Sequence, residues 1–183
     1  MNSSLLFIER IHRLHKSLAA ADILHAFGGA IALGWCTPQA RVTNDIDINI
    51  FVDPELGESV LIGLPDGVEV TDEACERLMR DGQARFWWET VPVDIFLNTT
   101  EFHIGAAARV QHREFEGVML PCLACGDLAV FKAFFDRGKD WLDIEAMVSI
   151  DSFDIDAATT EIERLLGPDD YRIAKLQALR ELG

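Results

Sequence analysis

The fold is decided by residues 27–52, which read FGGAIALGWCTPQARVTNDIDINIFV. A short apolar run ends at Gly28 and Gly29, and an apolar segment over 30–35 follows directly. This order is typical of a strand that turns tightly into a helix. A glycine pair at such a turn lets the backbone approach a phosphate closely, although Gly-Gly also occurs in plain turns.

The second half of this stretch alternates acidic and apolar residues. Ile46 separates Asp45 from Asp47, and isoleucine recurs at positions 48 and 50, which predicts a strand over 45–52 with one apolar face. Both carboxylates then lie on the other face, with Cα atoms roughly 6.6 Å apart. Two carboxylates on one face repel each other unless a cation lies between them, and Mg²⁺ prefers such oxygen ligands.

A third carboxylate lies in a later apolar segment, Val93–Leu97, as Asp94. If this segment forms a strand beside the first, three carboxylates converge on one point. Carboxylates that share two metal ions are a common arrangement for phosphoryl and nucleotidyl transfer. A glycine turn, Asp-x-Asp on a strand and a lone aspartate on a later strand together indicate a site for phosphoryl or nucleotidyl transfer. Their combination is a much stronger signal than any one of these features.

The rest of the chain predicts an α+β fold, with a mixed twisted sheet flanked by helices and a helical C-terminal third. We expect a single domain over 1–183, with a sheet core over about 1–120 and a helical extension over about 121–183 packed on it. Helical spacing is found over 3–21, 54–64, 72–80, 127–136, 139–149, 155–166 and 169–182. Strands are expected over 23–27, 84–90 and 93–97, with further extended structure over 109–120.

The formal net charge of −15 disfavours direct binding of long nucleic acids, because an acidic surface repels phosphates. It suits a small cationic substrate, a protein substrate or a basic partner, and it also suits solubility alone. No apolar run approaches the ~18 residues that cross a bilayer, so no membrane association is expected. The four cysteines include one isolated CxxC, Cys122 and Cys125, and are interpreted as buried small hydrophobes of a cytoplasmic protein.

Two segments, 27–34 and 41–48, resemble the core of the DNA polymerase β-like nucleotidyltransferase superfamily. They look closest to a small prokaryotic branch that includes abortive-infection-type nucleotidyltransferase toxins. Arg41 and Thr43 match an arginine and a Ser/Thr that precede Asp-x-Asp in this branch. Downstream, Lys132 and the Lys-Asp-x-x-Asp run that starts at Lys139 match its helical stretch.

The resemblance implies a nucleotidyltransferase fold and a Mg²⁺-dependent enzyme, with Mn²⁺ as an alternative metal. The donor would be a nucleoside triphosphate such as ATP, and an acceptor hydroxyl would attack the α-phosphorus with release of pyrophosphate. Asp45, Asp47 and Asp94 would ligate metal and carry catalysis. The nucleotide would contact Gly28, Gly29, Arg41, Thr43 and Lys132. The acceptor stays open among a small molecule, a protein and tRNA, and a toxin role with an antitoxin-like protein partner is a further hypothesis.

The candidate residues also have simpler, non-catalytic interpretations. The aspartate pair could line a solvated strand face, and Asp94 could pair with Arg41 or Arg85. Lys132 could extend to water or pair with Asp136. Asp140 and Asp143 could bind a base, orient Lys132 or face water, and exposure to water is favoured. Of Trp87 and Trp88, one is expected in the core, and the other could stack on a base.

At the level of function, the alternative is a non-catalytic nucleotide-binding or regulatory module of the same fold. Loss of Asp94 or of the glycines would favour that alternative, and all are present. A metal-dependent phosphohydrolase is a third hypothesis. Such sites usually include histidines at ligand spacing, and the five histidines of this chain do not show it.

Overall fold

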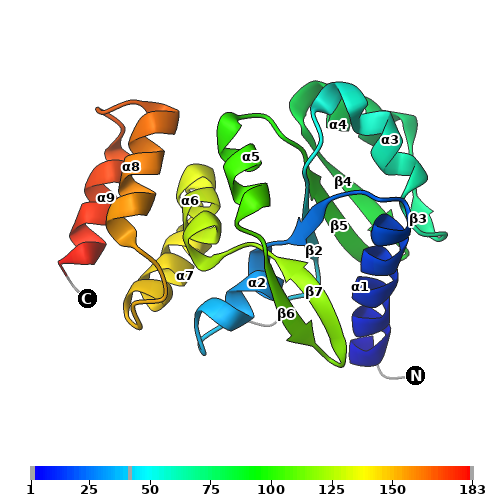
Figure 1. Ribbon diagram of the computed structural model, residues 1–183, viewed down its shortest axis with the longest axis horizontal. Coiled ribbons are helices and arrows are strands. Elements are labelled where there is room, and N and C mark those ends of the chain that lie inside the picture. Colours follow the sequence, from blue (N-terminus) through cyan, green and yellow to red (C-terminus); the bar gives the residue numbers. More distant parts are fainter. Residues whose placement is uncertain (1–2, 41–42, 182–183) are drawn as a thin grey trace. The chain divides into compact units, whose positions relative to one another are not determined.

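The computed structural model describes residues 3–40 and 43–181, and within them seven strands form one mixed sheet (Figure 1). The strand order is β3-β4-β5-β2-β1-β7-β6. The strands are β1 (His25–Phe27), β2 (Ile46–Ile50), β3 (Val68–Glu69), β4 (Gln83–Trp88), β5 (Val91–Phe96), β6 (Gln111–Phe115) and β7 (Val118–Cys122). β2 pairs with β5 and β1 with β7 in parallel, and the other neighbours are antiparallel.

Helices connect and extend this sheet. Those of the first two thirds are α1 (Ser3–Ala20), α2 (Gly29–Cys36), the 3-10 turn η1 (Pro54–Leu56), α3 (Gly57–Ile62), α4 (Asp72–Asp81) and α5 (Glu101–Ala108). The last third contains α6 (Cys125–Phe135), α7 (Gly138–Val148), α8 (Ile155–Leu166) and α9 (Tyr171–Arg180). None of the helices in the described part of the chain is both long and apolar enough to span a membrane.

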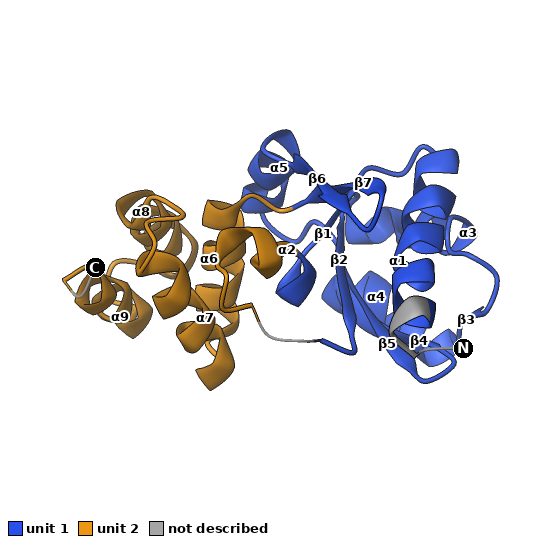
Figure 2. Cartoon of the chain, turned by 90° about the horizontal axis from the view of Figure 1, so that it is seen from below, with its two compact units in different colours: residues 1–31, 42–122 blue, residues 32–41, 123–183 orange. Residues whose placement is uncertain are grey.

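The chain divides into two compact units (Figure 2). Unit 1 comprises residues 1–31 and 42–122 and holds the whole sheet. Unit 2 comprises residues 32–41 and 123–183 and is helical. The division at 122/123 lies close to the composition change that the sequence places near 120. The packing of the whole chain as one domain stays a prediction.

In unit 1, strand alternation separates a buried face from a more open one. Ile46, Ile48 and Ile50 of β2 are fully buried, as are Val93 and Ile95 of β5. Because the side chains of a strand alternate between faces, the polar residues between them are held toward the other face. The apolar positions therefore fix the register that positions the aspartates.

In unit 2, helix packing and a disulfide hold the structure together. α6 packs on α7 and α8, and α9 packs on α7 and α8, around a core that includes Leu128, Ile144, Met147, Ile162 and Leu176. Cys36, at the end of α2, is bonded to Cys125, the first residue of α6. The interpretation of all four cysteines as buried hydrophobes was therefore wrong for this pair, whereas Cys75 and Cys122 are free.

Most expected elements are confirmed, including the strands around both aspartate motifs and the helical C-terminal third. The expected helix over 54–64 is split into η1 and α3. Two elements were not expected from the sequence, β3 and α5. α5 has apolar residues around its circumference rather than on one face, so helical periodicity does not reveal it.

A pair of histidines couples the stability of unit 1 to pH. His25 is buried, and its Nδ1–H donates to the Ile23 carbonyl at 2.7 Å, which leaves its Nε2 to accept from His15 Nδ1 at 2.9 Å. Burial lowers the pKa of both rings, and nearby histidines lower the pKa of His15 further. Protonation of His25 would place a positive charge in this buried site.

We therefore expect the free energy of unfolding to fall as the solution is acidified below about pH 6.5. The folded pKa values lie below the unfolded ones, so the unfolded chain binds more protons in this range and the stabilisation is complete only above it. Urea unfolding at about pH 7.5 and pH 5.5 measures the loss. The loss should be smaller in His15→Gln than in the wild type, and equal losses would contradict the assignment.

The disulfide gives a second prediction. Reduction of the wild-type protein should lower the free energy of unfolding by about 2–4 kcal/mol, because the Cys36–Cys125 link constrains the unfolded chain. Urea unfolding with and without reductant measures this change. Cys75→Ser should respond to reductant as the wild type does, whereas Cys36→Ser should not respond at all. A response of equal size in Cys36→Ser would rule out the disulfide as its cause.

Candidate functional site

Three charged side chains form a row across adjacent strands of unit 1. Asp47 of β2 is the register partner of Asp94 of β5, and Asp94 is the partner of Arg85 of β4. Adjacent strands lie about 4.8 Å apart, so the row Arg85–Asp94–Asp47 crosses three strands within a short distance. The sequence-based expectation that the strand of Asp94 lies beside the Asp-x-Asp strand is confirmed.

The turn at Gly28 and Gly29 contacts Asp47, which is at one end of this row. Gly29 has φ of +50°, and a Cβ atom added there would lie 1.9 Å from Oδ2 of Asp47. Any side chain at this position would force the Asp47 side chain to shift, and the left-handed conformation also favours glycine. The backbone N–H of Gly28 donates to the carbonyl oxygen of Asp47 at 2.9 Å. The turn and the aspartate strand are thus in direct contact.

Asp45 precedes β2 and is held by its own local turn. The Thr43 hydroxyl donates to the Asp45 carboxylate, and the Asp45 backbone N–H contacts Thr43 Oγ1 at 3.3 Å. Thr43 therefore orients Asp45, and its expected contact with a nucleotide stays a prediction. Arg41, the other residue predicted before Asp-x-Asp, lies outside the described residues.

Arg85 of β4 is a cation that pairs with Asp94. Its Nε donates to Asp94 Oδ1 at 2.8 Å and its Nη2 to Asp94 Oδ2 at 2.7 Å. The hydrogen bond to Asp94 raises the pKa of the guanidinium most, and the charges of Asp94, Asp45 and Asp47 raise it further. Of the alternatives that the sequence left open for Asp94, pairing with Arg85 is the one found in the structure.

The donor set fits a hard divalent cation, because carboxylate oxygens are the ligands that Mg²⁺ prefers. Within residues 3–40 and 43–181, no three acidic, histidine or cysteine side chains are already gathered as a metal site. Both oxygens of Asp94 point to Arg85 instead.

A polar cavity of about 350 Å³ lies beside Arg85. It extends toward β3, whereas β5 and β2, which carry Asp94 and Asp47, lie on the other side of β4. Trp87, which is 42% exposed, lies beside it, with the Arg85 guanidinium carbon 5.9 Å from the indole centroid. Trp88 is buried, as expected for one member of the pair. The remaining residues of the cavity come from β3, from α4 with its N-cap Thr71, and from β4: Glu69, Thr71, Glu73, Ala74, Arg77 and Phe86.

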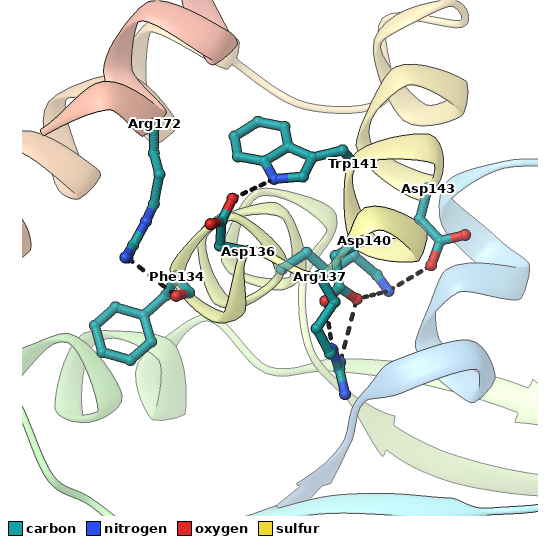
Figure 3. A network of polar contacts seen from close by, with 8 residues as sticks. Phe134, Asp136, Arg137, Asp140, Trp141, Asp143 and Arg172 are labelled. Carbon is teal, nitrogen blue, oxygen red and sulfur yellow. Dashed lines mark hydrogen bonds and ion pairs between the residues drawn. The ribbon is translucent and has the colours of Figure 1, made fainter.

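Lys132, the remaining candidate, lies in unit 2 and pairs with Asp140 and Asp143, which Figure 3 labels together with Arg137. Its ammonium group contacts Asp143 at 2.7 Å and Asp140 at 3.5 Å, and Arg137 also donates to Asp140. Asp140 and Asp143 are buried, so the favoured expectation that they face water was wrong. A contact between Lys132 and a nucleotide stays a prediction.

Asp136 does not pair with Lys132, contrary to one alternative from the sequence. Its side chain accepts hydrogen bonds from Trp141, Tyr171 and Lys175 (Figure 3 shows the bond from Trp141). These bonds, the one from Tyr171 first, lower the pKa of the Asp136 carboxyl strongly. The residue closes α6 in a left-handed conformation and ties it to α7 and α9. Its role is therefore structural.

Solved structures share this fold. A solution structure of the antibiotic-resistance factor ANT(2'')-Ia matches with a TM-score of 0.57 and 13% identity, over 100% of this chain and 92% of that one. A crystal structure of an antigenic nucleotidyltransferase-like protein from Paracoccidioides brasiliensis matches with a TM-score of 0.54 and 15% identity, over 94% and 93%. No family model and no curated protein sequence matches the chain. The fold is the nucleotidyltransferase fold, and the toxin-like branch stays a prediction.

The contact between Gly29 and Asp47 can be tested by adding one methyl group. Gly29→Ala should lower the free energy of unfolding by about 1–3 kcal/mol, because the methyl group meets the carboxylate at a strained backbone position. Gly34→Ala is the matched control within the same helix, since nothing lies within 4 Å of its added Cβ. The control should be neutral or more stable by up to about 1 kcal/mol. Equal effects in urea unfolding would contradict the described turn.

Proposed function

We propose that this protein is a divalent-metal-dependent nucleotidyltransferase, with Mg²⁺ or Mn²⁺ bound by the aspartates and a nucleoside triphosphate as donor. One observation carries the proposal: Asp47 lies between the glycine turn at Gly29 and the register partner Asp94. A backbone suited to phosphate and carboxylates suited to a cation are thus side by side in unit 1.

The triphosphate would meet the start of α2. The N–H of Gly28 is already bonded to Asp47, so the amides that remain for a phosphate are those of Gly29 and the first turn of α2. Such first-turn amides have no acceptor within their helix, and the helix dipole favours an anion there. The missing side chain at Gly29 makes room for the Asp47 carboxylate, which therefore lies directly beside these amides.

Asp45 and Asp47 would hold the metal, and Asp94 would join them after it leaves Arg85. A metal ion at these carboxylates would neutralise phosphate charge and orient the α-phosphorus for attack. Thr43 keeps Asp45 in place through its hydroxyl. Asp94, once released, could accept the proton of the acceptor hydroxyl, since a carboxylate near the attacking oxygen can act as a general base.

The acceptor is a small molecule, a protein or tRNA, and the charge of the chain favours the first two. A net charge of −15 repels a polyanion and attracts a cationic acceptor. A toxin role with an antitoxin-like protein partner is a finer form of the same proposal. A cytoplasmic location is also proposed, although the Cys36–Cys125 disulfide counts against a strongly reducing compartment.

A second candidate is a non-catalytic module that binds nucleotide without transferring it. The bidentate bond from Arg85 to Asp94 favours it, because this bond occupies both oxygens of the proposed base. The two candidates differ in one result. The enzyme releases pyrophosphate from a nucleoside triphosphate when acceptor is present, and the module binds the nucleotide without release.

The proposal is tested by calorimetric titration with each of the four nucleoside triphosphates plus Mg²⁺, and by transfer of radiolabel to cell extract. Extract fractionated into RNA, protein and small molecules identifies the acceptor. Asp47→Asn should lower transfer by at least about 100-fold, because it removes a metal ligand at nearly constant shape. The measurement is the rate of pyrophosphate release with the acceptor fraction.

Asp66→Asn is the control, since Asp66 is an exposed residue of unit 1 and the substitution removes the same charge. It should leave binding and transfer unchanged. Binding without transfer in the wild type would favour the non-catalytic module. Flat titrations with every nucleotide would overturn the proposed function in both forms.

A further inference from the structure

We infer that Arg85 is a built-in competitor of the metal: its guanidinium group occupies the place at Asp94 that a divalent cation would take, and metal binding requires its displacement. The inference rests on the proposed function, because it concerns the same three carboxylates. It assigns Arg85 a role in setting the affinity of the site for metal.

The first observation is the completeness of the bond. Arg85 donates from Nε and Nη2 to the two separate oxygens of Asp94, at 2.8 and 2.7 Å. A bidentate pair of this kind is among the stronger hydrogen-bonded arrangements of a carboxylate. Arg85 therefore already engages both of the Asp94 oxygens that a cation could bind.

The second observation is the position of the charge. Arg85, Asp94 and Asp47 are successive partners in the register of β4, β5 and β2. The guanidinium is stabilised electrostatically by Asp45 and Asp47 as well as by Asp94. It thus offsets the mutual repulsion of the same three carboxylates that a metal ion would offset. The guanidinium group and a divalent cation can therefore replace one another at these carboxylates.

The third observation is that Arg85 has somewhere to go. Its side chain is 47% exposed, whereas that of Asp94 is 17% exposed. On its other side lie the indole of Trp87, 5.9 Å from the guanidinium carbon, and the cavity of about 350 Å³. A guanidinium stacks well on an aromatic face, so the displaced side chain can rest on Trp87 while keeping its charge. No repacking of the buried face is needed.

Competition and an orienting role predict opposite changes in metal affinity when Arg85 is removed. If Arg85 only held Asp94 in position for the metal, its removal would weaken metal binding. If Arg85 competes with the metal, its removal strengthens metal binding. The sign of the change in affinity therefore separates the two roles without any assay of activity.

The experiment is a titration of the full-length chain with Mn²⁺ alone, with free Mn²⁺ followed by electron paramagnetic resonance. Arg85→Gln should bind Mn²⁺ about three- to tenfold more tightly than the wild type, the range expected for the loss of a half-exposed bidentate competitor. Arg85→Lys keeps the charge but loses the fork, so its affinity should lie between those two.

Arg77→Gln is the matched control. Arg77 lines the same cavity and its loss changes the net charge equally, but it bonds Glu73 rather than Asp94. Its affinity for Mn²⁺ should stay within about twofold of the wild type, since exposed ion pairs contribute little. An increase in Arg77→Gln as large as that in Arg85→Gln would overturn the inference, because net charge alone would then explain both.

The double variant Arg85→Gln/Asp47→Asn separates this inference from the proposed function. It should lose the Mn²⁺ binding gained in Arg85→Gln. Equal or weaker binding in Arg85→Gln, with binding still dependent on Asp47, would overturn the competitor role and leave the proposed function standing. No Mn²⁺ binding in either the wild type or Arg85→Gln would overturn the proposed metal site, and the competitor role with it.

Discussion

The site depends on the close approach of the Asp47 carboxylate to the backbone of Gly29. A Cβ atom at position 29 would overlap Oδ2 of Asp47, and the Gly28 amide is bonded to the Asp47 carbonyl. These two contacts fix where α2 begins relative to β2. The start of a helix and an acidic strand are thereby held together before any ligand binds, which reduces the ordering that a nucleotide would otherwise have to impose.

Charge balance is the second constraint on unit 1. Asp47 and Asp94 are register partners on adjacent parallel strands, and like charges directly opposite one another are destabilising. The strand on the far side of Asp94 supplies Arg85 at the matching position. Unit 2 contains a similar set of ion pairs around buried carboxylates, in which Lys132 and Arg137 neutralise Asp140 and Asp143. A chain with a net charge of −15 thus places cations where its carboxylates are closest.

The sequence was informative where local chemistry and periodicity agreed. The alternation in 45–52 predicted β2 and its apolar face, and Gly28-Gly29 predicted the turn before α2. It was less informative where a partner lies far along the chain. Cys36 and Cys125 are 89 residues apart, and nothing in their local surroundings indicates a disulfide. Asp140 and Asp143 look like surface residues of a helix, and only the tertiary position of Lys132 explains their burial. The sequence suggests Arg85 as one partner of Asp94, but the place of Arg85 in the row follows only from the strand register.

The central claim is that the carboxylates and the glycine turn form one pocket for a divalent cation and a triphosphate. A crystal structure with Mn²⁺ and a non-hydrolysable nucleoside triphosphate analogue, with the metal located by its anomalous scattering, tests this claim most directly. The account predicts an anomalous peak bounded by Asp45 and Asp47, with the phosphates against the backbone at Gly29. A nucleotide bound elsewhere, or a metal ion that touches neither aspartate, would contradict it.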